Sequence, residues 1–284
     1  MSALKQVILD ACEFVISGDP ADPYFSAIQA HAGHNDLLHA FTRHHLAADA
    51  ICLDVGANIG LTALMLSSAC PKGHVYAVEA GQINYGYLQA NVELNGLQAH
   101  VTPIACAVGA QSGALHVAEF GASSYVISDP AAAVAGTEAE MRTIDDIVSA
   151  LALDRIGLIK LDVEGFEPAA LAGAKETIER YSPWVFMEFN SWCLAFYHEF
   201  STRAFATAIW GAFDVLSVAL DGSLSPAAGG DPVRFLHENA VMHGCVDDVL
   251  LRLKPGASVP TFHAMTDNWQ TARLRAELEQ LKAH

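Results

Sequence analysis

The chain has 284 residues, of which 52% are hydrophobic and 17% charged, so it can bury a substantial core and is not extensively disordered. It holds 32 acidic residues against 15 Lys and Arg, and its formal net charge of −17 argues against nucleic acid or an anionic membrane as the main partner. The start has no signal-peptide pattern, and the longest apolar stretch, residues 204–220, contains Asp214 and is too short to span a membrane, so we expect a cytoplasmic protein.

The first segment, residues 1–48, is predicted to be a helical cap. Leu4, Ile8 and Val15 follow one another at helix-like spacing, and a second pattern of the same kind lies around residues 37–41. The segment ends near residue 49, where the hydrophobic pattern changes.

The main domain is predicted to span residues 49–265 and to have an α/β fold. Short apolar strands alternate there with amphipathic helices, a pattern typical of a mostly parallel sheet with helices on both faces. Seven strands are expected, near residues 51–55, 74–78, 100–105, 156–161, 184–189, 213–218 and 247–253.

Two other segments depart from this alternation. Within residues 113–146, the stretches 115–120 and 125–128 are expected to form extra strand or loop material, which commonly builds one wall of a substrate site. Residues 266–284 are predicted to form a C-terminal helix with leucines on one face. This helix either packs on its own domain or pairs with a second copy in a homodimer.

The most informative motif is Ile-Cys-Leu-Asp-Val-Gly-Ala-Asn-Ile-Gly at residues 51–60. An apolar strand leads through Asp54 into a tight turn at Gly56 and Gly60, where backbone N–H groups can approach a nucleotide-sized ligand. The turn lacks the Gly-x-Gly-x-x-Gly spacing that holds a pyrophosphate. Because Asp54 would repel a diphosphate but can hold the ammonium group of a methionine, the motif favours S-adenosylmethionine over NAD.

Two further strand ends complete the predicted cofactor crevice. Glu79 ends the second strand, where a carboxylate can accept both ribose hydroxyls of NAD or of S-adenosylmethionine, or instead cap the next helix. The third strand runs into small residues that include Cys106 and Ala107. They leave room for a flat base, although small residues also allow tight helix packing.

Acidic residues follow the fourth and fifth strands. Asp162 and Glu164 lie at the end of one strand, and Glu188 and Asn190 at the end of the next. Because the carboxyl ends of parallel strands meet at one edge of a sheet, these side chains should converge beside the crevice. Acids placed next to a cationic sulfonium are hard to explain by packing, so the predicted catalytic residues are Asp162, Glu164 and Glu188.

The order of these motifs resembles that of the FkbM-type methyltransferases. The resemblance covers residues 50–190 and rests on Leu-Asp-Val-Gly-Ala-Asn-Ile-Gly, Val-Tyr-Ala-Val-Glu-Ala, Asn-Val-Glu-Leu-Asn-Gly, Thr-Ile-Asp-Asp-Ile, Ile-Lys-Leu-Asp-Val-Glu-Gly and Met-Glu-Phe-Asn. It implies a class I, Rossmann-like fold with S-adenosylmethionine as methyl donor. It also implies transfer, usually to a hydroxyl oxygen of a small molecule, polyketide or sugar.

The resemblance also implies a role for each strand end. The turn at residues 54–60 would hold the methionine end of the donor and Glu79 the ribose. Asp162 and Glu164 would lie on the reaction side. Many members have a proline after the ribose-binding acid, where this chain has Ala80, which puts the adenine-side contacts in doubt. The predicted cofactor-binding residues are Asp54, Gly56, Ala57, Asn58, Gly60, Glu79, Ala80, Cys106, Ala107 and Asp162.

Two ways of activating an acceptor hydroxyl are open. In the first, Asp162 or Glu164 accepts the hydroxyl proton as methyl transfer proceeds. In the second, Asp162, Glu188 and Asn190 hold Mg²⁺, which lowers the pKa of the hydroxyl. His198, shortly after the fifth strand, is an alternative base.

The expected acceptor is a small molecule or a glycan. A nucleic-acid acceptor is disfavoured because no Asn/Asp-Pro-Pro-Tyr/Trp segment follows the fourth strand. Two other functions compete with methyl transfer. One is a NAD-binding oxidoreductase, which Glu79 would suit, and the other is a non-catalytic binding module with a methyltransferase-like fold.

Overall fold

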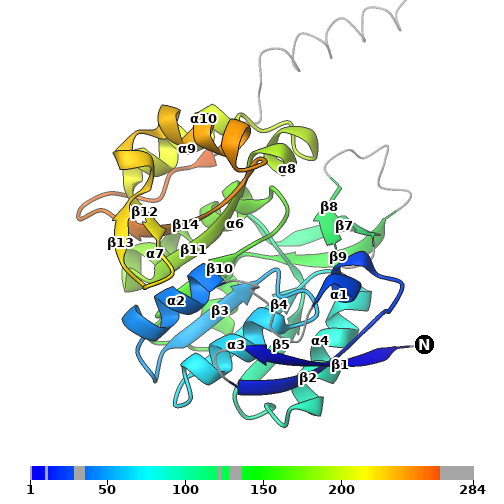
Figure 1. Ribbon diagram of the computed structural model, residues 1–284. Helices are drawn as coiled ribbons and strands as arrows, with labels where there is room; N and C mark the ends of the chain where they lie inside the picture. Colours follow the sequence, from blue (N-terminus) through cyan, green and yellow to red (C-terminus); the bar gives the residue numbers. More distant parts are fainter. Residues whose placement is uncertain (1, 10–11, 29–35, 121–122, 128–135, 263–284) are drawn as a thin grey trace, which may run out of the picture.

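A mixed β-sheet forms the centre of the computed structural model (Figure 1). The structure describes residues 2–9, 12–28, 36–120, 123–127 and 136–262. The sheet strands are β3 (Ile51–Val55), β4 (His74–Glu79), β5 (Val101–Ala105), β10 (Leu158–Leu161), β11 (Trp184–Asn190), β12 (Phe213–Val218), β13 (Leu224–Pro226) and β14 (Val246–Leu253). Within the described residues the sheet is eight-stranded, in the order β13-β12-β14-β11-β10-β3-β4-β5.

Most of this sheet is parallel. The neighbours β5, β4, β3, β10 and β11 all run in one direction, so their carboxyl ends lie at one edge. β14 runs antiparallel to β11 and β12. Each of the seven expected strands is present, but the expected strand number was wrong. The additional strand, β13, is a three-residue edge strand that ends at Pro226 and pairs with β12. It is too short to be recognised from its sequence pattern.

Helices cover both faces of the sheet, as expected. Successive strand residues alternate between two buried clusters, with Leu53 in one and Cys52 in the other. The helices are α1 (Pro23–Ala27), α2 (Asp36–His45), α3 (Leu61–Ala69), α4 (Gln82–Leu94), α5 (Ile144–Ala150), α6 (Glu167–Ala172), α7 (Lys175–Tyr181), α8 (Ser191–Phe196), α9 (Thr202–Ala212) and α10 (Pro232–Met242), with a 3-10 helix at Ala227–Gly230. Among the described residues, none of these helices has the length and apolar character needed to cross a bilayer.

The prediction of a helical cap was wrong for its first part. Two strands, β1 (Ala3–Leu9) and β2 (Cys12–Gly18), pair antiparallel there, and helices follow only at α1 and α2. The buried residues Val7, Leu9, Phe14 and Ile16 alternate with exposed ones at the period of a strand, whereas Leu4 is 65% exposed. The apparent helical spacing therefore did not mark the buried face. The domain boundaries at residues 48 and 265 stay predictions.

The segment between β5 and β10 builds a second, smaller sheet. It contains β6 (Ala107–Val108), β7 (Gly113–Phe120), β8 (Ser123–Val126) and β9 (Thr137–Arg142), in the order β6-β9-β7-β8. The extra strands expected in this region are therefore present. The predicted C-terminal helix, residues 266–284, lies outside the described residues.

Candidate functional site

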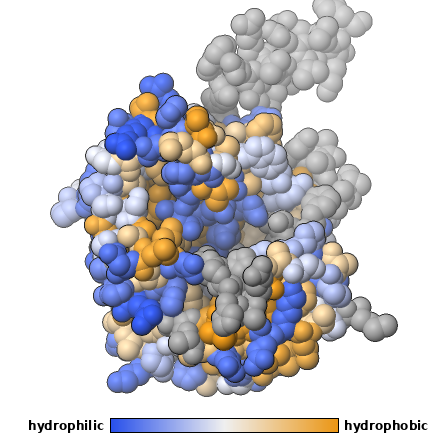
Figure 2. Space-filling model, viewed as in Figure 1, coloured by the Kyte–Doolittle hydropathy of each residue, from blue (hydrophilic) through white to orange (hydrophobic). Residues whose placement is uncertain are grey.

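A cavity of about 310 Å³ lies at the carboxyl edge of the large sheet. The space-filling view shows a recessed, largely hydrophilic area near the end of β3 (Figure 2). The residues that line the cavity come from both sheets, from the amino-terminal segment, from the loops after β3, β4, β5 and β10, and from the start of α3. They are Tyr24, Val55, Gly56, Ala57, Asn58, Leu61, Thr62, Val78, Glu79, Ala80, Cys106, Ala107, Val108, Val117, Tyr125, Val126, Lys160, Asp162, Val163, Glu164, Phe166 and Glu188.

The glycine turn forms the floor of this cavity because two strands approach it closely. The N–H groups of Gly56 and Ala57 donate to the Val78 carbonyl of β4, at 3.0 and 2.9 Å. Gly56 has a φ of +77°, and a Cβ atom there would lie 1.8 Å from the carbonyl oxygen of Asp162. Only glycine fits such a position. Gly60 caps the start of α3 and is not among the lining residues.

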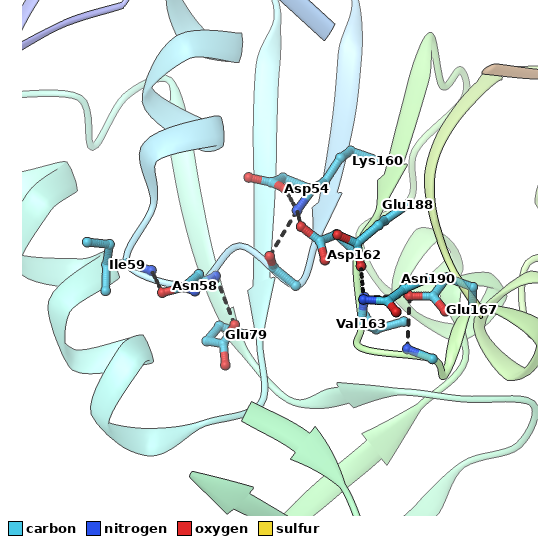
Figure 3. A network of polar contacts seen from close by, with 12 residues as sticks. Asp54, Asn58, Ile59, Glu79, Lys160, Asp162, Val163, Glu167, Glu188 and Asn190 are labelled. Atoms are coloured by element: carbon cyan, nitrogen blue, oxygen red, sulfur yellow. Dashed lines mark hydrogen bonds and ion pairs between the residues drawn. The ribbon is translucent and has the colours of Figure 1, made fainter. Parts of the chain in front are cut away.

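Asp54 lies behind the cavity wall rather than in it. Its side chain is fully buried, and its Oδ1 is 3.5 Å from the ammonium group of Lys160 (Figure 3). The same ammonium is 3.2 Å from Asp162 Oδ2 and donates to the Gly56 carbonyl at 3.0 Å. The structure thus places Lys160 where the sequence predicted the ammonium group of the donor.

Both members of this buried pair have shifted pKa values. Burial raises the pKa of the Asp54 carboxyl above its ordinary value. Burial alone would lower the pKa of Lys160, but the carboxylates of Asp162 and Asp54 outweigh it, so that pKa is raised. The sequence analysis missed Lys160, although a lone charge inside the apolar strand Leu158–Leu161 was a usable signal.

Glu79 fixes two loops at the cavity edge. It is 3% exposed, its Oε2 accepts the N–H of Asn58 at 2.9 Å, and its Oε1 accepts the N–H of Gly81 at 2.8 Å. Gly81 is the residue before α4. The side chain therefore lines the cavity and also holds the backbone of two loops, whereas the cap residue of α4 is Gly81.

One part of the cavity wall is apolar. Cys106 and Ala107, which the sequence placed beside the cofactor, line it together with Val117 and Val126 of the small sheet. Burial raises the pKa of the Cys106 thiol to about 11, so the thiol is protonated at neutral pH. The small side chains leave a flat, uncharged space.

Asp162, Glu164 and Glu188 line the cavity together. Burial, followed by the charges of neighbouring acids that include Asp162, raises the pKa of Glu188 to about 9. Asn190 donates to Glu188 Oε2 at 3.3 Å, and Cys193 donates its thiol proton to Glu164 Oε2 at 3.2 Å. Burial also raises the pKa of Glu164. The three carboxyl groups thus differ in their partners, since Asp162 pairs with Lys160, Glu164 with Cys193 and Glu188 with Asn190.

The loop that carries Asp162 and Glu164 is held by a residue that sequence reasoning missed. Glu167 is fully buried, and its Oε1 accepts the N–H groups of Val163 at 2.9 Å and Gly165 at 3.4 Å. Burial raises the pKa of Glu167 to about 8. No sequence signal separates this acid from its neighbours, because its burial comes from the packing of α6.

Aromatic residues also form part of the wall, and of these the sequence analysis missed Tyr24 and Phe166. Tyr24 comes from α1, Phe166 from the loop before α6, and Tyr125 from β8. His198, the alternative base, does not line the cavity. Its Nε2 lies 3.2 Å from the Glu164 carbonyl, and burial lowers its pKa to about 4, so it is neutral and serves that loop.

The arrangement gives no support to the Mg²⁺ hypothesis. Among the described residues, no group of three or more His, Cys, Asp or Glu has the geometry of a metal site. Asp162 instead pairs with Lys160, and the amide nitrogen of Asn190 points at Glu188.

Comparison with known proteins identifies one family. Residues 54–203 match the methyltransferase FkbM domain. The methyltransferase sdnD of Sordaria araneosa is 26% identical over 169 residues, which cover 49% of this chain and 65% of sdnD. The chain therefore spans just under two thirds of that relative.

Solved structures give more distant matches. The methyltransferase FkbM of Methylobacillus flagellatus is 17% identical with a TM-score of 0.42, and the match covers 75% of this chain and 47% of that one. An O-methyltransferase of Bacillus cereus is 11% identical with a TM-score of 0.44, over 81% of this chain and 86% of that one.

Proposed function

Because the chain belongs to the FkbM methyltransferase family, we propose that its cavity binds S-adenosylmethionine and that the protein transfers the methyl group to a hydroxyl of a small molecule or glycan. One observation carries this proposal. A single cavity contains the glycine turn and Glu79 together with the carboxyl groups of Asp162, Glu164 and Glu188.

The residues present suit the donor. Each oxygen of Glu79 accepts one backbone N–H, and a carboxylate can accept several hydrogen bonds at once, which suits the two ribose hydroxyls. The apolar side at Cys106 and Ala107 suits the flat base. Among the described lining residues, Lys160 is the one Lys or Arg side chain, and carboxylates on both sides neutralise it. The wall therefore attracts the cationic sulfonium.

The acceptor must lose a proton while the donor supplies a methyl group on a positively charged sulfur. The C–S bond breaks as the C–O bond forms, and the hydroxyl proton passes to a carboxylate. Glu188 has a pKa of about 9 and is protonated at neutral pH, and Asp162 is held by Lys160. Glu164, whose pKa is raised by burial, is the proposed base, with Asp162 and Glu188 orienting the hydroxyl.

Calorimetry with S-adenosylmethionine, S-adenosylhomocysteine and NAD tests the cofactor. We expect the two adenosyl compounds to bind and NAD not to bind, and tight NAD binding would refute the proposal. Glu79→Ala should weaken donor binding by about tenfold, a loss of about 1.4 kcal/mol, because the hydrogen-bond acceptor for the ribose hydroxyls is removed.

Release of S-adenosylhomocysteine in the presence of candidate acceptors tests the reaction. Glu164→Gln should lower turnover about 100-fold and weaken donor binding far less, because its main effect is to remove the group that accepts the proton. Tyr181→Phe is a matched control, since Tyr181 lies outside the cavity and donates to Leu153. Equal turnover of Glu164→Gln and the unmodified protein would exclude Glu164 as the base.

A further inference from the structure

A continuous strip of aromatic rings leads from the cavity to the surface. The strip consists of Tyr125, Tyr197, Trp192 and Phe196. Tyr125 lines the cavity, and its ring stacks on that of Tyr197, with centroids 4.1 Å apart and planes 2° from parallel. Trp192 meets Tyr197 edge-on at 5.0 Å and stacks on Phe196 at 5.0 Å. The inner end of the strip thus belongs to the cavity and its outer end lies on α8.

The outer rings are unusually exposed for their type. Trp192 is 45% exposed and Phe196 is 70% exposed, although both belong to a helix whose Cys193 and Leu194 are buried. Large aromatic side chains left in solvent, adjoining a cavity, mark a binding surface more often than a packing defect. The sequence explains the position of these two rings. They belong to α8, which begins directly after the end of β11 that carries Glu188 and Asn190.

A second ring contact ties the strip to the reaction side. His198 lies against Phe166, which lines the cavity, and its centroid is 6.4 Å from that of Tyr197. The same His198 contacts the Glu164 carbonyl. Tyr125 at the inner end of the strip and the proposed base Glu164 line the same cavity.

Charge restricts what such a molecule can be. An anionic group would meet the carboxylates of Asp162 and Glu164, and the described lining offers no basic side chain except the already paired Lys160. A cationic group would be repelled by the sulfonium that the proposed function places in the same cavity. An uncharged molecule avoids both costs, and the protonated Glu188 can hydrogen-bond with it.

We propose that the aromatic strip is the acceptor subsite, and that it takes an uncharged acceptor whose hydroxyl is carried on or beside a ring with an apolar face, either an aromatic ring or a pyranose. This inference rests on the proposed function. Ring faces bind such molecules by stacking, and the neighbouring carboxyl groups accept or donate hydrogen bonds to hydroxyls.

The test uses three phenyl probes that differ in charge, with sinefungin present throughout, a cationic analogue of S-adenosylmethionine that has no transferable methyl group. Phenyl β-D-glucopyranoside is neutral, phenyl phosphate is anionic and phenethylamine is cationic. Ligand-observed NMR titration should give the tightest dissociation constant for the glucoside. Equal or tighter binding of either charged probe would overturn the proposal.

Variants locate the binding surface. Trp192→Ala and Phe196→Ala should each weaken glucoside binding roughly 3- to 10-fold, and Trp192→Phe should retain most of it because a ring remains. Leu94→Ala is a matched control, since Leu94 is 48% exposed and ends α4, and it should bind like the unmodified protein. Melting temperatures establish that all variants fold.

Calorimetry separates the two levels of failure. If neither the unmodified chain nor any variant binds S-adenosylmethionine, the proposed function is refuted. If the donor binds normally to all of them while Trp192→Ala and Phe196→Ala leave glucoside binding unchanged, the proposed function stands and the acceptor subsite is refuted.

Discussion

At the scale of single residues, the site depends on one buried cation. Lys160 is 4% exposed and holds Asp54, Asp162 and the Gly56 carbonyl with one ammonium group. A buried charge is stable only while its partners are present, and removal of one partner leaves the other without compensation. The glycine turn and the acidic loop are therefore joined by Lys160.

Lys160→Met should destabilise the protein by about 3 kcal/mol, because it leaves the carboxylate of Asp54 buried without a counter-charge. Urea unfolding measures this loss. Adding Asp54→Asn to Lys160→Met should restore about 1 kcal/mol or more, since both charges are then gone. If Lys160→Met unfolds at the same urea concentration as the unmodified protein, the pair does not contribute as described.

At the scale of elements, a buried asparagine helps to fasten the amino-terminal hairpin to the domain. Asn91 of α4 is fully buried, and its Oδ1 accepts the N–H of Ser17 at 2.6 Å. Its Nδ2 donates to the carbonyls of Ser17, at 3.1 Å, and Ile59, at 2.8 Å. The side chain thus joins β2, α4 and the end of the glycine turn.

Asn91→Ala should lower the free energy of unfolding by about 2 kcal/mol, because it leaves buried backbone groups without partners. Faster proteolysis of the hairpin should accompany the loss. Asn95→Ala is the matched control, since Asn95 makes similar bonds to Val15 at an exposed position and should cost less than about 1 kcal/mol. Equal losses in both variants would contradict this account.

Much of the element order followed from local patterns. The seven expected strands and the helices between them are marked by apolar runs bounded by turn residues, which need no knowledge of tertiary structure. The prediction for the hairpin segment failed because Leu4, Ile8 and Val15 fit a helical spacing by chance. Contacts with α4 decide which of its residues are buried. Likewise, Lys160 and Glu167 receive their roles only from the packing of distant segments.

At the scale of the whole molecule, stability is linked to pH through buried acids. The pKa of Glu167 is raised from 4.5 to about 8, and that of Asp248 from 3.8 to about 6, in both cases first by burial. A group whose folded pKa is raised stabilises the protein fully below its unfolded pKa. That contribution is lost as the pH rises through the folded pKa.

Glu167→Gln isolates one part of this dependence. Between pH 6 and pH 9 the unmodified protein should lose about 2 kcal/mol more stability than the variant, because the buried carboxyl group of Glu167 ionises in this range and the amide of the variant cannot. Urea titrations at a series of pH values measure the difference. Glu179→Gln serves as control, since its pKa is lowered, first by its bond with Lys175, and does not titrate in this range. Parallel pH profiles for Glu167→Gln and the unmodified chain would refute the assignment.

Tyr24 belongs to the amino-terminal segment and lines the cavity. Its phenol belongs to the wall and is buried enough that its pKa rises to about 12, although it precedes β3, the first strand of the large sheet. A variant without residues 1–48 would keep every strand of that sheet but lose Tyr24 from the cavity wall. If the donor binds there as proposed, its affinity depends on how the segment that carries Tyr24 packs against the sheet.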